Sequence, residues 1–306
     1  MSWREVADRG ALRREVGQTR PVMAPALRMA RWVDGQCPYQ GPGAKPMKHK
    51  EARMVSVDGP AGRLMATVEG DGGIPALFVH DVGADRTHWA ETQSGLATHT
   101  VAFDLRGLGE SSGPRGPFGV EAAVEDVAAV ADALTPEKFV LVGHGFGAAV
   151  AGAFAAYYPE RLAGLLYVEA PGDLRRMPKA EAEAWLDNFS AAKYGAFHEH
   201  WLTPQLLAAK DSTRVLVMKT MRTSRREAIA GNLESLLAHD PDAAFEQFKG
   251  PTHALVAATG PETLVGQRAD LSRSVAPHSS HWLMLDSAKW FHAEVVRFLG
   301  QCRHHP

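Results

Sequence analysis

The 306-residue chain has few cysteines, no excess of one charge and no long apolar run. Its two cysteines, Cys37 and Cys302, lie near opposite ends, which argues against a disulfide framework and a cysteine zinc site. Lys and Arg number 33 against 35 Asp and Glu, so no basic surface for nucleic acid is indicated. Apolar runs such as 139–142 are far too short to cross a bilayer. We therefore expect a cytoplasmic globular protein that binds neither nucleic acid nor membrane, with its oligomeric state open.

What is present is ordinary globular composition, 45% apolar and 22% charged, with 29 glycines. The length allows two average domains or one large domain with an insertion. Residues 1–50 differ from the rest, because they are rich in arginine and contain a run of turn-forming residues at 35–43. We predict a loosely ordered extension for 1–50 and a short tail at 301–306.

Buried strands and amphipathic helices alternate along the chain from about residue 51, after a predicted β-hairpin at 53–68. This alternation predicts an α/β fold with a doubly wound, mainly parallel sheet. Between 172 and 248 the pattern is helical throughout, which predicts a helical cap inserted into a core made of 51–171 and 249–300. The predicted strands are 76–80, 99–104, 139–142, 165–168 and 254–258, and the main predicted helices are 121–134, 146–157 and 286–299.

A glycine-rich turn, Gly143-His144-Gly145-Phe146-Gly147, joins a predicted strand to a predicted helix. A turn this sharp needs small residues at its outer positions, because a Cβ there would collide with the neighbouring backbone. The segment resembles the G-x-S-x-G nucleophile elbow of the α/β-hydrolase superfamily. The position that carries the serine in that motif is Gly145.

Four further segments resemble the same superfamily and follow its order along the chain, over roughly residues 51–300. The resemblance implies an α/β-hydrolase fold of the esterase, lactonase and haloperoxidase-like branch, with a helical cap that selects a small-molecule substrate. The four segments are the H-G-x-G-like oxyanion loop at 80–83 with Trp89 after it, the D-x-R-G-x-G-x-S-like segment at 104–111, the Y-P-E-R exit at 158–162, and the catalytic-histidine segment at 279–282.

By this resemblance His281 is the catalytic base, and a carboxylate should orient its ring. Glu262, just past the predicted strand at 254–258, is the favoured partner. Glu169, at the end of the strand at 165–168, is the alternative used by some branches, and Asp173 is a weaker third.

Two positions depart from the superfamily's pattern. Gly145 has no side chain and cannot attack a substrate, although a glycine relieves the strained backbone of the elbow. The oxyanion donors implied by the resemblance are the backbone N–H groups of Phe146 and of Val82 or Asp81. Asp81 stands where the motif has glycine, and its carboxylate works against an oxyanion unless it points away or is protonated.

Three functions follow from these residues. The first is a protein that descends from hydrolases of small acyl or ester-type substrates. In it Gly145 replaces the serine nucleophile, and a His281–Glu262 dyad is retained. The second is an enzyme without a nucleophile, in which the histidine acts as a base on water or on an acidic substrate proton. The third is a pseudoenzyme that binds a small molecule without turnover. None of them calls for a cofactor or a metal ion.

Overall fold

The computed structural model describes residues 31–32, 52–111, 113, 115–135, 137–189, 193–194, 202, 205–257 and 263–303. Most of the predicted N-terminal extension, the last three residues of the predicted tail and Glu262 lie outside these residues.

Nine strands of the described chain form a single sheet in the order β1-β2-β3-β5-β4-β6-β7-β8-β9. The six strands β5, β4, β6, β7, β8 and β9 are parallel to one another. Strands β1, β2 and β3 pair antiparallel, and β3 joins them to the rest of the sheet through an antiparallel pairing with β5. This confirms the predicted mainly parallel α/β sheet. The strands are β1 Arg31–Trp32, β2 Arg53–Gly59, β3 Gly62–Glu69, β4 Ala76–Val79, β5 Thr100–Phe103, β6 Phe139–His144, β7 Leu162–Val168, β8 Thr252–Val256 and β9 Arg273–Val275.

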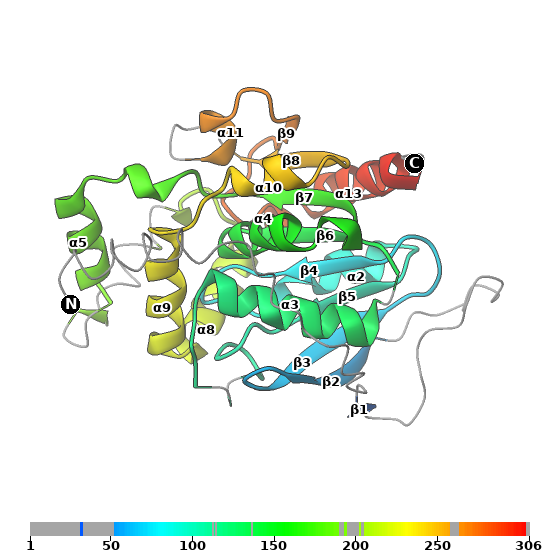
Figure 1. Ribbon diagram of the computed structural model, residues 1–306, viewed down its shortest axis with the longest axis horizontal. Helices are drawn as coiled ribbons and strands as arrows, with labels where there is room; N and C mark the ends of the chain where they lie inside the picture. The colour runs from blue at the N-terminus through cyan, green and yellow to red at the C-terminus, as the bar shows by residue number, and fades with distance from the viewer. Residues whose placement is uncertain are drawn as a thin grey trace.

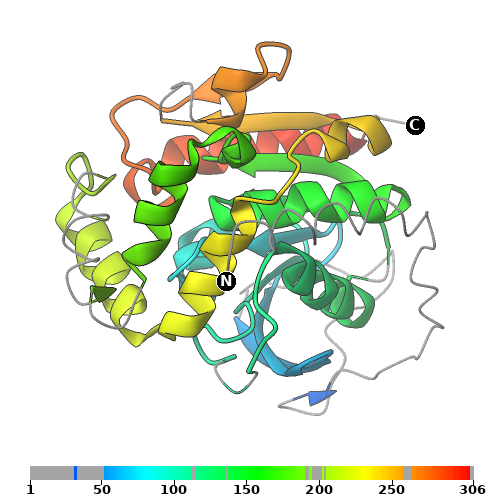
Figure 2. The same ribbon diagram turned by 60° about the vertical axis from the view of Figure 1, so that its left-hand side comes forward.

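Helices cover both faces of this sheet, with α3 and α4 on one face and α2 and α13 on the other (Figure 1). Helices α5, α8 and α9 gather beyond one end of the strands, and the turned view brings this end forward (Figure 2). The helices are α2 Ala90–Gly95, α3 Val120–Leu134, α4 Phe146–Tyr157, α5 Lys179–Asp187, α8 Asp211–Thr223, α9 Arg226–Leu236, α10 Ala243–Gln247, α11 Leu264–Gln267, α12 Leu283–Asp286 and α13 Ala288–Arg303, with short 3₁₀ turns at Arg86–Trp89, Pro159–Arg161 and Leu174–Arg176. None of the described helices combines the length and apolarity needed to span a membrane.

The sheet itself brings three loops together. Strands β4, β6 and β7 are parallel neighbours, so the loops that follow them start side by side at the same edge. Strand β4 pairs with β5 on one side and with β6 on the other, which makes its carboxyl end a point where the winding direction changes. Open α/β sheets bind their ligands in the crevice at such a point. The residues after these strands include Asp81, Gly145 and Glu169, so the topology places all three at this crevice.

A buried ion pair secures the loop after β5. Arg106 Nε and Nη2 donate to the two carboxylate oxygens of Asp126 on α3, each at 2.7 Å, and the two side chains are 3% and 0% exposed. Asp126→Ala leaves a buried guanidinium without its main partner, so we expect a loss of about 3–5 kcal/mol in the free energy of unfolding. Asp132→Ala is the control, because Asp132 pairs with Arg161 while 67% exposed, and should cost about 1 kcal/mol or less. Equal losses in urea unfolding would contradict this account.

Candidate active site

The turn between β6 and α4 is the segment that resembles a nucleophile elbow, and its central residue has no side chain. Gly145 has φ +53° and ψ −116°. A Cβ at Gly143 or Gly147 would overlap main-chain atoms, which explains why the outer positions are glycine. At Gly145, in contrast, the nearest atoms that a Cβ would overlap belong to the carboxylate of Asp81. The space expected for the serine side chain is therefore filled by an aspartate from the loop after β4.

The Asp81 carboxylate also occupies the expected oxyanion hole. The backbone N–H groups of Val82 and Phe146, two of the donors that the resemblance implies, both donate to Asp81 Oδ1, at 2.8 and 2.6 Å. Asp81 is 5% exposed. Its carboxylate therefore points into the hole and takes up both donors.

His80 fixes the main chain beside this carboxylate. Its Nδ1–H donates to the backbone oxygen of Asp81 at 2.7 Å, and its Nε2 accepts from Leu105 N–H at 3.0 Å. One ring nitrogen therefore donates and the other accepts, so the ring bridges the loop after β4 and the loop after β5. The sequence identifies His80 as part of the loop motif, and its pattern gives no sign of this bridging role.

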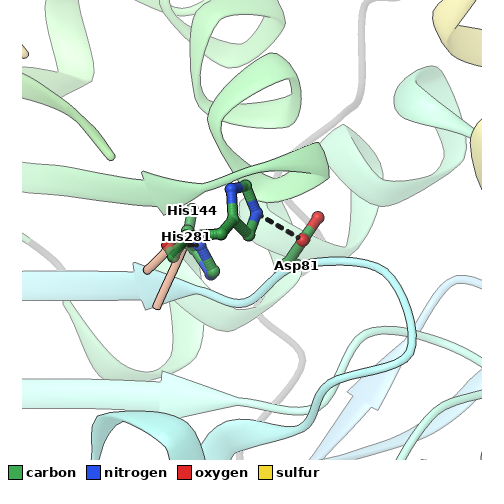
Figure 3. A group of neighbouring side chains, drawn as sticks. All are labelled: Asp81, His144 and His281. Carbon is green, nitrogen blue, oxygen red and sulfur yellow. Dashed lines mark hydrogen bonds and ion pairs between the residues drawn. The ribbon is translucent and has the colours of Figure 1, made fainter. Parts of the chain in front are cut away.

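His281 lies between two carboxylates, those of Asp81 and Glu169, and Figure 3 shows the Asp81 side of this arrangement. Its Nε2 is 3.1 Å from Asp81 Oδ2, and its Nδ1 is 3.3 Å from Glu169 Oε2. The His281 side chain is 21% exposed, so it is partly open to solvent. Glu169, the alternative partner, is thus the carboxylate that the structure places against the ring, while the favoured partner Glu262 lies outside the described residues.

Glu169 follows β7 directly and is held in a strained conformation. Its φ of +48° is uncommon for any residue other than glycine and costs on the order of 1 kcal/mol. Its Oε1 accepts from Ala257 N–H at 2.6 Å, after β8, which leaves Oε2 directed at His281. The third candidate, Asp173, instead pairs with Arg175 at 2.7 Å.

The pKa values of Asp81 and His281 are shifted in opposite directions, each toward its charged form. Burial opposes ionisation of Asp81, but the hydrogen bond with His281 and that from Phe146 N–H outweigh it and lower the pKa of Asp81 to about 2. Burial likewise disfavours a charged His281, but its hydrogen bonds and charge attraction to Asp81 and Glu169 raise its pKa to about 10. At neutral pH an imidazolium therefore lies between two carboxylates.

His144 stands beside His281, with the ring centroids 4.5 Å apart, and its Nε2–H donates to the backbone oxygen of His281 at 3.0 Å (Figure 3). Burial, followed by the positive charge of His281, lowers the pKa of His144 to about 3, so this ring is neutral. Asp81, His144 and His281 bring possible metal-binding atoms within 4.8 Å of one another. Because Asp81 and His281 already satisfy each other as an ion pair, we assign no metal ligand here.

The alpha/beta hydrolase family model matches residues 76–294. The chain belongs to this family.

Its relatives have diverse activities. It is 26% identical over 322 residues to the dihydrolipoyllysine-residue acetyltransferase component of an acetoin cleaving system from Pseudomonas putida, covering 95% of this chain and 84% of that one. It is 36% identical over 106 residues to a 2-hydroxy-6-oxo-2,4-heptadienoate hydrolase from the same species, covering 33% of this chain and 38% of that one. Several further curated relatives are matched over 29–37% of their own length.

Among solved structures, an esterase from Thermogutta terrifontis superposes with a TM-score of 0.70 and 23% identity, over 82% of this chain and 99% of that one. At this identity the likeness shows the fold alone.

Proposed function

We propose that this alpha/beta hydrolase family protein hydrolyses a small organic substrate, with His281 at the centre of the chemistry and Glu169 orienting its ring. One observation carries the proposal: the His281 ring lies between the Glu169 carboxylate and the point where the Val82 and Phe146 N–H groups converge. This is the placement that a histidine needs in order to serve a reacting group held at those donors. The strained φ of Glu169 supports it, because such strain gathers at functional sites.

Direct activation of a water molecule by His281 in the free protein is the less favoured mechanism for this hydrolysis. A base must be unprotonated to take a proton, and a His281 with a pKa near 10 is protonated at neutral pH. The ring can accept a proton only after Asp81 has lost its negative charge or moved away. Small esters and lactones, the substrates that the superfamily resemblance favours, therefore meet an occupied oxyanion hole in the free protein.

A binding protein without turnover is the second candidate. The observation in its favour is that Asp81 neutralises the charge of His281 and satisfies both oxyanion donors, so the described site is chemically complete without a substrate. Thermal-shift measurements with short esters, lactones and haloalkanes would detect such binding, while assays on the same compounds report turnover.

The proposal is tested with His281→Gln and Glu169→Gln, assayed on those three compound classes. We expect His281→Gln to lose turnover about a thousandfold or more, because the ring acts on the reacting atoms. Glu169→Gln should lose turnover by about 10⁴-fold, as loss of the orienting carboxylate does in a Ser-His-Asp triad. It should also shift the His281-dependent limb of the pH profile to lower pH, because Glu169 raises the pKa of His281. His278→Gln is the matched control on the same loop, since His278 is exposed. Full activity in His281→Gln would refute the function.

A further inference from the structure

We infer that Asp81 is the nucleophile that replaces the missing serine, and that it attacks a saturated carbon bearing a good leaving group, as in a small haloalkane. The inference rests on the proposed function and names its substrate class. It is carried by the reciprocal geometry of two positions: Gly145 lacks a side chain, and the Asp81 carboxylate fills the space that this leaves. A carboxylate from the loop after β4 thus stands where the elbow would present a hydroxyl.

The two carboxylate oxygens have different environments. Oδ1 is held by the N–H groups of Val82 and Phe146, whereas Oδ2 faces His281 and has no other hydrogen bond among the described residues. A carboxylate oxygen has more than one lone pair, so Oδ2 can attack while Oδ1 stays bound. The group is ionised and nearly buried, so it needs no base to become a nucleophile and carries little water to be removed.

The occupied oxyanion hole selects the electrophile. Attack on an acyl carbonyl places negative charge on the substrate's oxygen, and that oxygen needs donors such as Val82 and Phe146 N–H. Both donors are already bound to Asp81 Oδ1. Displacement at a saturated carbon places the charge on the leaving group instead, so it makes no demand on these donors. The free protein is therefore preorganised for displacement.

The first step forms a C–O bond from Asp81 Oδ2 to the substrate carbon and breaks the carbon–halogen bond, whose electron pair leaves with the halide. The product is a neutral alkyl ester of Asp81. Because that ester no longer carries the charge that stabilises the imidazolium, His281 releases its proton to solvent, which balances the halide.

In the second step His281 takes a proton from water as the water oxygen attacks the Asp81 carboxyl carbon. The negative charge develops on Oδ1, where Val82 and Phe146 N–H already point. Collapse breaks the bond to the alkoxy group, which takes the proton from His281 and leaves as the alcohol. The Asp81 carboxyl group then returns a proton to His281. The sum is haloalkane plus water giving alcohol, halide and one proton.

Apolar side chains cover the loop at Gly83, as a haloalkane substrate requires. A Cβ at Gly83 would overlap the Met221 side chain of α8 and lie 3.7 Å from Ile229 Cδ1 of α9. Both side chains are buried, and they cover the loop from the side of the inserted helices. Small substrates with alkyl chains fit this lining better than charged ones.

The test uses 1-bromobutane with the full-length protein. Halide release should depend on Asp81, and His281→Gln, which lacks the base for the second step, should accumulate one butyl group on the peptide that contains Asp81. Single turnover in H₂¹⁸O should place ¹⁸O in Asp81 and none in the alcohol. Asp81→Asn should show neither adduct nor halide release, whereas the nearby control Asp85→Asn should behave as wild type.

Absence of halide release together with absence of an adduct in His281→Gln overturns the inference. If p-nitrophenyl butyrate is then hydrolysed with full dependence on His281, the proposed hydrolase function stands and only the substrate class and nucleophile fall. If His281→Gln retains full turnover on every compound, the proposed function falls as well. An adduct on a residue other than Asp81 would also overturn the assignment of the nucleophile.

Discussion

Gly145→Ser alone should yield no esterase, whereas the double change Asp81→Gly/Gly145→Ser should yield a serine hydrolase. A serine Cβ at position 145 overlaps the Asp81 carboxylate, so the single variant must displace a buried, ionised group. Overpacking of this kind costs about 1–3 kcal/mol, and we expect the single variant to be less stable than wild type. Even where it folds, both oxyanion donors remain bound to Asp81.

The double variant removes this obstruction and makes two further changes. It frees the N–H groups of Val82 and Phe146 for a substrate oxyanion. It also removes the carboxylate that contributes most to the raised pKa of His281, so the pKa of this ring should fall toward 6.5 and the ring can act as a base for the new serine. Since loss of a triad nucleophile costs about a million-fold in turnover, a gain of at least about a thousandfold over wild type is expected.

The measurement is hydrolysis of p-nitrophenyl butyrate by four proteins: wild type, each single variant and the double variant. Asp81→Gly is the control that empties the oxyanion hole without supplying a nucleophile. Strong activity in Gly145→Ser alone would show that Asp81 does not block the elbow. A double variant that folds, as judged by circular dichroism, and still gains nothing would contradict the assignment of Gly145 as the nucleophile position.

Much of the fold follows from periodicity and turn chemistry. The all-buried strands β4, β5 and β6 and the helices α3 and α4 lie within a few residues of their predicted ranges, because strongly apolar runs leave a chain few alternatives. The helical segment from Arg86 to Gly95 was not predicted, since it is short and lacks an apolar repeat. Strand β8 begins at Thr252, two residues before its predicted start, in register with β7.

The contacts within the candidate active site were harder to predict from the sequence than the fold. The place of Glu262 just past a predicted strand, where the superfamily carries its acid, favours it as the partner of His281. Contact with Glu169 instead depends on β7 lying beside β6 and on the left-handed backbone at Glu169. The sequence shows two separate departures from the superfamily's motifs: glycine in place of serine at 145, and aspartate in place of glycine at 81. The sequence does not show that the two changes compensate each other, because this depends on where the Asp81 carboxylate lies in the folded chain.

The ion pair between Asp81 and His281 should give the protein a characteristic pH dependence of stability. The pKa of His281 is raised from 6.5 to about 10 on folding, so its contribution is fully present below pH 6.5 and is lost as pH rises through about 10. The pKa of Asp81 is lowered from 3.8 to about 2, so its contribution is present above pH 3.8 and is lost as pH falls through about 2. Both contributions are complete between about pH 4 and 6.5.

Asp81→Asn keeps the shape of the side chain and removes its charge, which leaves Glu169 as the only carboxylate bonded to His281 among the described residues. The wild-type shift of the His281 pKa from 6.5 to about 10 is worth on the order of 5 kcal/mol, and we expect the variant to lose a substantial part of it at pH 6. That deficit should shrink steadily as pH rises toward 10, where wild type has lost the same contribution. Urea unfolding of both proteins between pH 5 and 10 measures this, with the exposed Asp132→Asn as control. A deficit that stays constant from pH 6 to 10 would mean that His281 is not charged in the folded protein, because only a charged ring couples the stability of the site to pH in this range.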